Sequence, residues 1–356
     1  MIGAKYKYGF IIILTLFFLT SCKSTLQERN AKEDYGAYLM VFFKDEDHSL
    51  HMALSTDGRS FTDINNGNAV IAGDTIAEQK GIRDPHIYRD YKGWFYLAMT
   101  DLHIFGKEEG LRETQWERPE EYGWGNNRGF VLMKSRDLIH WDKANVRIDK
   151  SFSGYDEIGC AWAPEIIFDD ESDRIMLYYT MRFKSGTNKL YYSYVNDDFN
   201  KLTTKPKLLF EYPKDISYID ADITKVNNQY HMFYTPHDGT PGIKQAVSHK
   251  INMDYEYYPK WIDPEPQACE APHVWKINNE DRWILMYDIY GIQPHNFGFL
   301  ETIDFKEFKN LGHFNEGPMK ATNFSSPKHG SVISLTKKEA QNLADYWGSN
   351  ISIDTI

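Results

Sequence analysis

The chain has 356 residues, of which 42% are hydrophobic and 15% aromatic, and its formal net charge is -11 at pH 7. This length and hydrophobic content suffice for one large β domain or for two domains of ordinary size. An acidic chain repels polyanions, so we expect no nucleic-acid partner and a neutral substrate. Three cysteines exclude the disulfide framework of a small secreted scaffold, and no C-x-x-C, H-E-x-x-H or P-loop pattern occurs.

The N-terminus predicts a targeting segment. Lys5 and Lys7 precede an apolar run over 10–19, which is too short to span a bilayer in the mature protein. The run ends in Leu19-Thr20-Ser21-Cys22, which resembles a bacterial lipobox. Cleavage before Cys22 would leave this cysteine as the lipidated N-terminus. An ordinary secretory signal or an uncleaved anchor is the alternative.

The lipobox sets the expected domain organisation and location. We predict a signal peptide over 1–21, a polar tether over 22–34 and one folded domain over 35–356. The protein would be a monomer in the cell envelope, attached to the membrane by its lipid. The periplasm or outer membrane of a Gram-negative bacterium is the expected site.

Short runs of β-branched and aromatic residues between polar turns predict strands along the body of the chain. A helical period is clear only over 337–347. The clearest strand runs are 38–43, 94–99, 174–181, 229–234 and 282–287.

A turn pattern repeats between these strands and predicts the fold. Ser55-Thr56-Asp57 is typical of it, and the aspartates at 57, 137, 198, 254 and 304 lie 50 to 80 residues apart. This spacing is close to one four-stranded propeller blade with its loops. The N-terminal unit lacks the first strand of a blade, whereas the run over 328–333 predicts a strand that no further strands follow in the chain. We therefore predict an all-β, five-bladed β-propeller whose last blade is closed by N- and C-terminal strands, with an irregular β-sandwich as the alternative.

Three segments place a carboxylate at the start of an apparent strand. They are Arg83-Asp84-Pro85, Ile219-Asp220-Ala221-Asp222 and Cys269-Glu270-Ala271-Pro272. If the strands converge, the carboxylates share a cleft, and cleavage of a glycosidic bond needs one acid and one base on opposite sides of the sugar. The pattern predicts a glycosidase.

The order of these motifs resembles glycoside hydrolase family 43 and its five-bladed relatives. The resemblance runs from about residue 38 to the C-terminal region. Glu-Ala-Pro stands where Glu-Gly-Pro is more familiar, and Glu165 stands where an aspartate often follows Trp-Ala-Pro; neither change removes a catalytic carboxylate. The matching segments are Gly81-Ile82-Arg83-Asp84-Pro85-His86-Ile87, Cys160-Ala161-Trp162-Ala163-Pro164-Glu165, Tyr218-Ile219-Asp220-Ala221 and Glu270-Ala271-Pro272-His273-Val274-Trp275-Lys276.

The resemblance implies the roles of the carboxylates. Asp84 would be the general base that activates water, and Glu270 the general acid that protonates the leaving oxygen. Asp220 would orient the acid and keep its pKa high. Asp222, two residues further along the same strand face, is the alternative for this third role.

Four further side chains are candidates around this site. Trp162 would form an aromatic wall or belong to the core, and Arg83 would bind a substrate hydroxyl or pair with a carboxylate. His273 would line the cleft. His329 matches a histidine that in relatives lies near the propeller axis, where it would ligate calcium or another structural cation, or it is an ordinary hydrogen-bonded histidine. No cofactor is expected to be required.

We therefore predict an inverting glycosidase acting on neutral polysaccharides or oligosaccharides, arabinofuranosidase-like or xylosidase-like, with galactan-directed exo activity as the next choice. The alternatives are a retaining propeller glycosidase acting on fructosides and a surface glycan-binding lipoprotein without catalysis.

A long insertion over 103–129, which contains Tyr122 and Trp124, would form a wall or lid over the pocket or a solvated excursion. Cys160 and Cys269 are expected to be packed thiols, with a disulfide between them as the alternative.

Overall fold

The computed structural model describes residues 1, 3, 34–113 and 120–353 of the chain. Cys22, the predicted signal peptide apart from residues 1 and 3, and most of the predicted tether lie outside the described residues. The body forms one compact unit over 34–356. Among the described residues, no helix has the length and apolar character needed to cross a bilayer.

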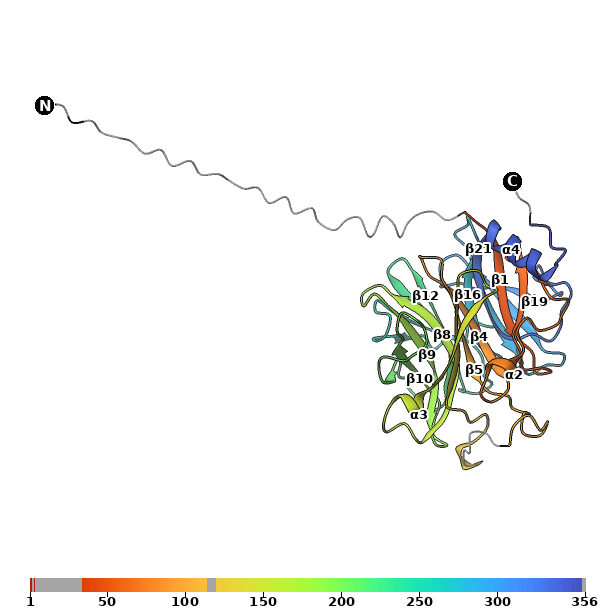
Figure 1. Ribbon diagram of the computed structural model, residues 1–356, viewed down its shortest axis with the longest axis horizontal. Coiled ribbons are helices and arrows are strands. Elements are labelled where there is room, and N and C mark those ends of the chain that lie inside the picture. The colour runs from red at the N-terminus through yellow and green to blue at the C-terminus, as the bar shows by residue number, and fades with distance from the viewer. Residues whose placement is uncertain (2, 4–33, 114–119, 354–356) are drawn as a thin grey trace. The chain divides into compact units, whose positions relative to one another are not determined.

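Five sheets, antiparallel except for one short parallel pair in the last blade, are arranged as the blades of a propeller, which confirms the predicted fold (Figure 1). In the first four blades the first strand lies innermost, and the innermost strands of neighbouring blades contact one another. Blade I contains β4 (Ile82–Arg89), β5 (Phe95–Asp101), β6 (Gly129–Ser135) and β7 (Trp141–Arg147); blade II contains β8 (Ile158–Asp169), β9 (Arg174–Phe183), β10 (Lys189–Tyr194) and β11 (Lys207–Leu208); blade III contains β12 (Tyr218–Val226), β13 (Gln229–Pro236), β14 (Lys244–Ser248) and β15 (Glu256–Tyr257); blade IV contains β16 (Glu270–Lys276), β17 (Trp283–Ile289), β18 (Asn296–Thr302) and β19 (Lys309–His313).

Blade V joins the two ends of the chain, as the strand inventory predicts. Its innermost strand is β21 (Lys328–Thr336), which pairs antiparallel with β1 (Tyr35–Phe43). The remaining strands are β2 (His51–Ser55), β3 (Ser60–Asp63) and β20 (Lys320–Ala321). Closure pairs strand edges that would otherwise be exposed.

The helices are short except at the C-terminus. They are α2 (Gly73–Ile76), η1 (Glu120–Tyr122), α3 (Ile148–Ser151) and α4 (Lys337–Trp347). The helix α4 packs against β1 and β21. It begins with a capping box between Thr336 and Glu339 and ends at Gly348, whose φ of 64° suits glycine.

The repeated aspartates lie in the turns between the third and fourth strands of the blades. The Asp57 carboxylate accepts hydrogen bonds from the backbone N–H groups of Arg59 and Ser60. Asp137 and Asp304 make the same two bonds in blades I and IV. In blades I, IV and V the side chain therefore replaces backbone partners that a tight turn cannot supply, whereas in blade II Asn196 Oδ1 accepts the bond from the N–H of Asn200.

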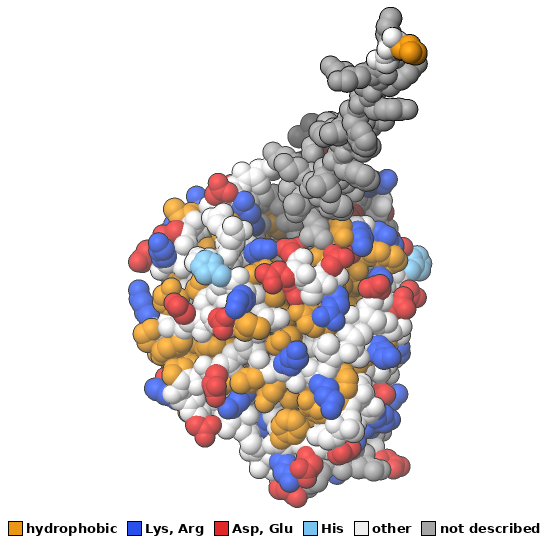
Figure 2. All heavy atoms as spheres, turned by 90° about the vertical axis from the view of Figure 1, so that its left-hand side faces the viewer, with side chains coloured by type: hydrophobic (Ala, Val, Ile, Leu, Met, Phe, Trp, Pro, Cys, Tyr) orange, Lys and Arg blue, Asp and Glu red, His pale blue; other side chains and the backbone are white. Residues whose placement is uncertain are grey.

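Aromatic side chains fill the spaces between neighbouring blades. Phe130 of blade I and Tyr179 of blade II, for example, have ring centroids 4.9 Å apart within one buried cluster. On the surface face shown in Figure 2, acidic and basic side chains are interspersed, with hydrophobic ones between them. This face carries no broad basic patch of the kind that binds nucleic acid.

Candidate active site

Each innermost strand carries a β-bulge at the same level of the propeller. The register with the neighbouring strand shifts across four residues, the second of which has a positive φ between 30° and 55°. A bulge re-aims the side chains on either side of it. The five equivalent tetrapeptides are Arg83-Asp84-Pro85-His86, Trp162-Ala163-Pro164-Glu165, Ile219-Asp220-Ala221-Asp222, Glu270-Ala271-Pro272-His273 and Lys328-His329-Gly330-Ser331.

The bulges are held by side chains from the second strand of the preceding blade. Thr100 Oγ1 on β5 accepts a hydrogen bond of 2.8 Å from the N–H of Ala163. Thr180 Oγ1 on β9 accepts one of 3.0 Å from Asp220, and Asp288 Oδ2 on β17 accepts one of 3.2 Å from His329. In blades II, III and V these bonds satisfy the buried N–H of the second residue, and so stabilise its positive-φ backbone.

The bulges bring the three predicted carboxylates together. Asp84, Asp220 and Glu270 all line one cavity of about 590 Å³ at the propeller axis, within the size range of small-molecule sites. The first residue of every tetrapeptide also lines this cavity. The predicted convergence of the strands is therefore present in the structure.

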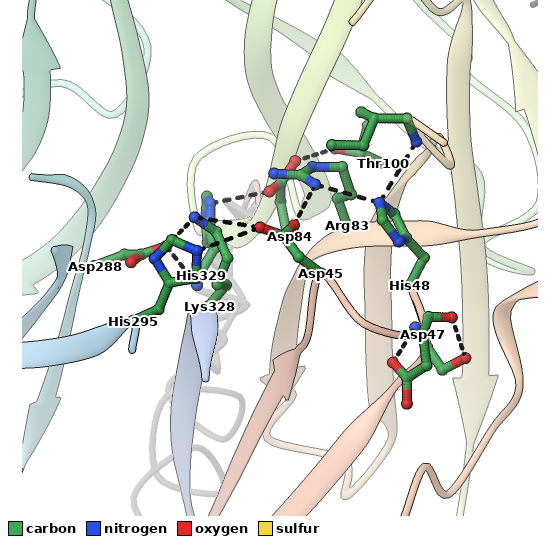
Figure 3. Close-up of polar contacts among 12 residues, drawn as sticks. Asp45, Asp47, His48, Arg83, Asp84, Thr100, Asp288, His295, Lys328 and His329 are labelled. Atoms are coloured by element: carbon green, nitrogen blue, oxygen red, sulfur yellow. Dashed lines mark hydrogen bonds and ion pairs between the residues drawn. The ribbon is translucent and has the colours of Figure 1, made fainter. Parts of the chain in front are cut away.

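Asp84 lies in surroundings that favour its charged form. Its Oδ2 accepts a 2.6 Å hydrogen bond from Thr100 Oγ1, and its Oδ1 lies 3.3 Å from His329 Nδ1 (Figure 3). Burial alone would raise the pKa of Asp84, but His329, Arg83 and Thr100 hold the pKa of this carboxyl well below its usual range. Asp84 is thus an ionised carboxylate that can accept a proton.

Glu270 has the opposite character. Burial is the largest cause, and the negative charges of Asp220 and Asp288 add to it, so that the pKa of Glu270 is raised above its usual range. The pKa of Asp220 is also raised by burial and by Asp84, although the His329 charge opposes this. Two carboxyl groups whose pKa values are pushed apart are the arrangement that acid and base catalysis needs.

Arg83 and Trp162 both contribute to the cavity wall. Arg83 Nη1 also donates a 2.7 Å hydrogen bond to Asp45 Oδ1, so the carboxylate that it pairs with is Asp45 (Figure 3). The indole N–H of Trp162 donates a 2.7 Å hydrogen bond to the carbonyl of Gly125. Trp162 is therefore a wall residue whose ring orientation is fixed.

His273 does not line the cavity, which corrects its predicted place. It is the fourth residue of its tetrapeptide, beyond the bulge, and it is buried. Its Nε2 donates a 3.0 Å hydrogen bond to the carbonyl of Val332, and its Nδ1 lies 3.2 Å from Asp222 Oδ1. The side chain links blades IV and V below the cavity.

Asp222 likewise departs from its predicted place. Strand alternation would put it on the same face as Asp220, but the bulge between Ile219 and Asp222 breaks that alternation. Asp222 Oδ2 instead accepts a hydrogen bond of 3.2 Å from the N–H of Val274. Asp220 alone of the two lines the cavity.

Calcium or another cation at His329 stays a prediction. Burial lowers the pKa of His329, but the neighbouring Asp84 carboxylate outweighs this effect and the pKa is raised to about 9; Nδ1 of the ring lies 3.3 Å from Asp84 Oδ1. Among the described residues, one group has metal-ligand spacing, and it comprises His86, Asp222 and His273. It offers two imidazoles and one carboxylate, whereas calcium takes six to eight oxygen ligands. His86 Nδ1 in addition accepts a hydrogen bond from the N–H of Ile166.

Sequence analysis did not identify several polar residues of this site. Thr100 and Asp288 each hold a bulge, and buried Lys328 lines the cavity with its Nζ 3.4 Å from Asp288 Oδ2 (Figure 3). An alignment of the five tetrapeptides would have shown that Lys328 occupies the same first position as Arg83. Cys160 and Cys269 are both buried and free, so the alternative of a disulfide is not realised.

Known proteins resemble this chain in sequence and in fold. An α-L-arabinofuranosidase of Bifidobacterium longum subsp. longum is 23% identical over 239 residues, which are 59% of this chain and 20% of that protein. The chain thus spans about a fifth of this curated relative. An endo-arabinase of Bacteroides thetaiotaomicron superposes with a TM-score of 0.55 at 16% identity, covering 75% of this chain and 92% of that one. An endo-1,4-β-xylanase of the same organism gives 0.56 at 13% identity, covering 82% and 99%.

The solved structures share the fold with this chain. A family model described as a probable glycosyl hydrolase domain, related to glycoside hydrolase family 43, matches residues 33–341. This match covers most of the chain and includes all three cavity carboxylates. The chain therefore belongs to this family 43-related group of glycosyl hydrolases.

Proposed function

We propose that this protein hydrolyses neutral polysaccharides or oligosaccharides with inversion at the anomeric carbon. The observation that carries the proposal is the opposed electrostatics of two carboxyl groups in one cavity. Asp84 is held ionised by His329 and Thr100, whereas Glu270 is held protonated by burial and by Asp220. An inverting glycosidase needs this pair of a base and an acid.

In the proposed reaction, Asp84 takes a proton from a water molecule whose oxygen attacks the anomeric carbon. Glu270 gives its proton to the glycosidic oxygen while the bond between that oxygen and the anomeric carbon breaks. Asp220 keeps Glu270 protonated before the step through its nearby charge. The two carboxyl groups then exchange protons with solvent, and the reaction requires no cofactor.

An α-L-arabinofuranoside is the first substrate to test, and a β-xyloside is the second. The curated arabinofuranosidase supports the first, with the limited coverage given above. The side chains at the cavity wall are suited to a neutral sugar, because Arg83 is paired with Asp45 and Lys328 lies near Asp288. Neither residue therefore offers the unpaired positive charge that would select the carboxylate of a uronic acid.

The test is a screen of arabinosyl, xylosyl and galactosyl oligosaccharides, with products separated by chromatography. Proton NMR of the first-formed sugar, recorded before mutarotation, should show inverted configuration. Asp84→Asn should abolish turnover, while retained configuration in the wild-type product would refute the base role of Asp84. Glycan binding without turnover would favour the non-catalytic binding protein.

We further propose that the protein is a monomer attached to the cell envelope through a lipid on Cys22. The lipobox and the basic residues before its apolar run support this proposal. A lipid anchor would hold the glycosidase where polysaccharides or their fragments arrive at the cell.

A further inference from the structure

The catalytic cavity is closed below the carboxylates. The fourth residues of the tetrapeptides form a ring at that level and are all buried, with exposed fractions of 1% to 5%. They also connect adjacent blades, as when Ser331 Oγ accepts a hydrogen bond of 2.8 Å from the N–H of Ile87. The ring consists of His86, Glu165, Asp222, His273 and Ser331. A sugar chain cannot pass along the axis through this ring.

The wall of the cavity comes from all five blades, including Asp45, Leu102, Asn188, His237 and Tyr290. Because the floor is closed and every blade contributes to the wall, we infer that substrate enters from the side opposite the floor, through one mouth. A sugar bound beside Asp84 and Glu270 must then be joined to the rest of its chain through that mouth. Groups at the mouth therefore contact the leaving part of the substrate.

Trp124 is the aromatic side chain that such a leaving sugar would meet. It lines the cavity, yet 63% of it is exposed, which is the largest exposed fraction among the described aromatic residues. Its ring centroid lies 5.6 Å from that of Trp162 in an edge contact, and the Arg83 guanidinium lies 5.8 Å from its centre. An indole with an open face at the mouth of a pocket is suited to stacking on a sugar ring.

The backbone around Trp124 is fixed by buried donors. Arg182 Nη2 donates hydrogen bonds to the carbonyls of Tyr122 at 2.9 Å and Trp124 at 2.8 Å. The same guanidinium lies 4.8 Å from the Trp162 ring, whose N–H holds Gly125. A solvated excursion would not require a buried arginine. This anchoring presents the indole at low entropic cost, which is how a binding surface is pre-organised.

We propose that Trp124 is the platform for the leaving-group sugar and that the enzyme releases sugars from chain ends. This inference rests on the proposed glycosidase function. It assigns part of the 103–129 insertion to substrate specificity. Trp124 stacks on the sugar next to the cleaved bond, so it acts in binding and takes no part in proton transfer.

The test measures kcat/KM of Trp124→Ala and of the wild type on two substrates. The first is an oligosaccharide that the wild type cleaves, and the second is the glycosyl fluoride of the released sugar, whose leaving fluoride is too small to reach Trp124. We expect kcat/KM for the oligosaccharide to fall about tenfold, mainly through KM, and that for the fluoride to be unchanged. Trp124→Phe should recover most of the loss. Tyr346→Ala, which removes an aromatic ring that is 58% exposed on α4, should change neither value.

Equal losses on both substrates, or no loss on either, would overturn the platform role. Wild-type products that are internal fragments would overturn release from chain ends. If the wild type hydrolyses no substrate, the proposed function fails, and calorimetric titration with the same oligosaccharides then tests Trp124 separately. An affinity that is the same in Trp124→Ala and the wild type would overturn the platform role in that case.

Discussion

Thr100 connects the stability of the propeller to the charge of Asp84, the proposed general base. Its hydroxyl donates a 2.6 Å hydrogen bond to Asp84 Oδ2 and accepts a 2.8 Å hydrogen bond from the N–H of Ala163 in the next blade. Thr100 is fully buried, so water does not replace either bond when the hydroxyl is removed. Thr100→Val keeps the shape of the side chain and deletes both bonds.

The expected cost of Thr100→Val follows from these two contacts. A hydrogen bond to a charged group contributes about 1.5–3 kcal/mol, and a buried N–H left without a partner costs about 1–3 kcal/mol. The free energy of unfolding should therefore fall by about 3–5 kcal/mol. Urea titration measures this change. Loss of the bond should also raise the pKa of Asp84, so the acidic limb of the pH profile of kcat/KM should move to higher pH.

Thr100→Ser is the matched control, because it keeps the hydroxyl and removes only a methyl group. It should retain the acidic limb of the wild type and most of the stability. If Thr100→Val unfolds within about 0.5 kcal/mol of the wild type, the bulge is not held by this hydroxyl. An unchanged acidic limb would show that Thr100 does not affect the ionisation of Asp84.

Three further predictions concern the carboxylates and the N-terminus. Glu270→Gln should slow hydrolysis of natural glycosides by about two to four orders of magnitude and that of activated aryl glycosides less, since only a poor leaving group needs the proton; equal losses would contradict the acid role. The wild-type pH profile should be broad, because activity is lost when pH falls through the lowered pKa of Asp84 or rises through the raised pKa of Glu270. His329→Gln removes the cation beside Asp84, so the acidic limb of the profile should move to higher pH. A variant in which only the basic limb moves would be inconsistent with this ion pair. Metabolic labelling with a fatty acid should tag the wild type but not Cys22→Ala, and an untagged wild type would exclude the lipoprotein.

The propeller was predictable because its signals are local. In blades I, IV and V a turn of the Asp57 type satisfies its own backbone within a few residues, so the pattern is visible in the sequence of these blades. The closure of blade V followed from a missing first strand at one end and an unmatched strand, β21, at the other. The three cavity carboxylates were found because each stands at the start of an innermost strand.

The inner architecture of the site was not predictable from alternation. An unbroken strand would put Asp220 and Asp222 on one face, and it would put Glu270 and His273 on opposite faces. The bulges insert a residue with positive φ into each strand and change these relations. The bulge at Asp220, for example, depends on an acceptor from a different blade, Thr180, which lies 40 residues away along the chain.

The tetrapeptides thus combine two roles that a motif match does not separate. Their first and second positions supply the cavity side chains, including Glu270, Asp84 and Asp220. Their fourth positions are polar because they join adjacent blades: His86 accepts from the N–H of Ile166, and Asp222 from that of Val274. Burying a polar group costs free energy unless the group is hydrogen-bonded, and here the hydrogen bonds are those that join one blade to the next. The cavity carboxylates and the polar groups that join the blades therefore lie two or three residues apart, which explains why Asp222 and His273 resemble site residues in the sequence although they connect neighbouring blades.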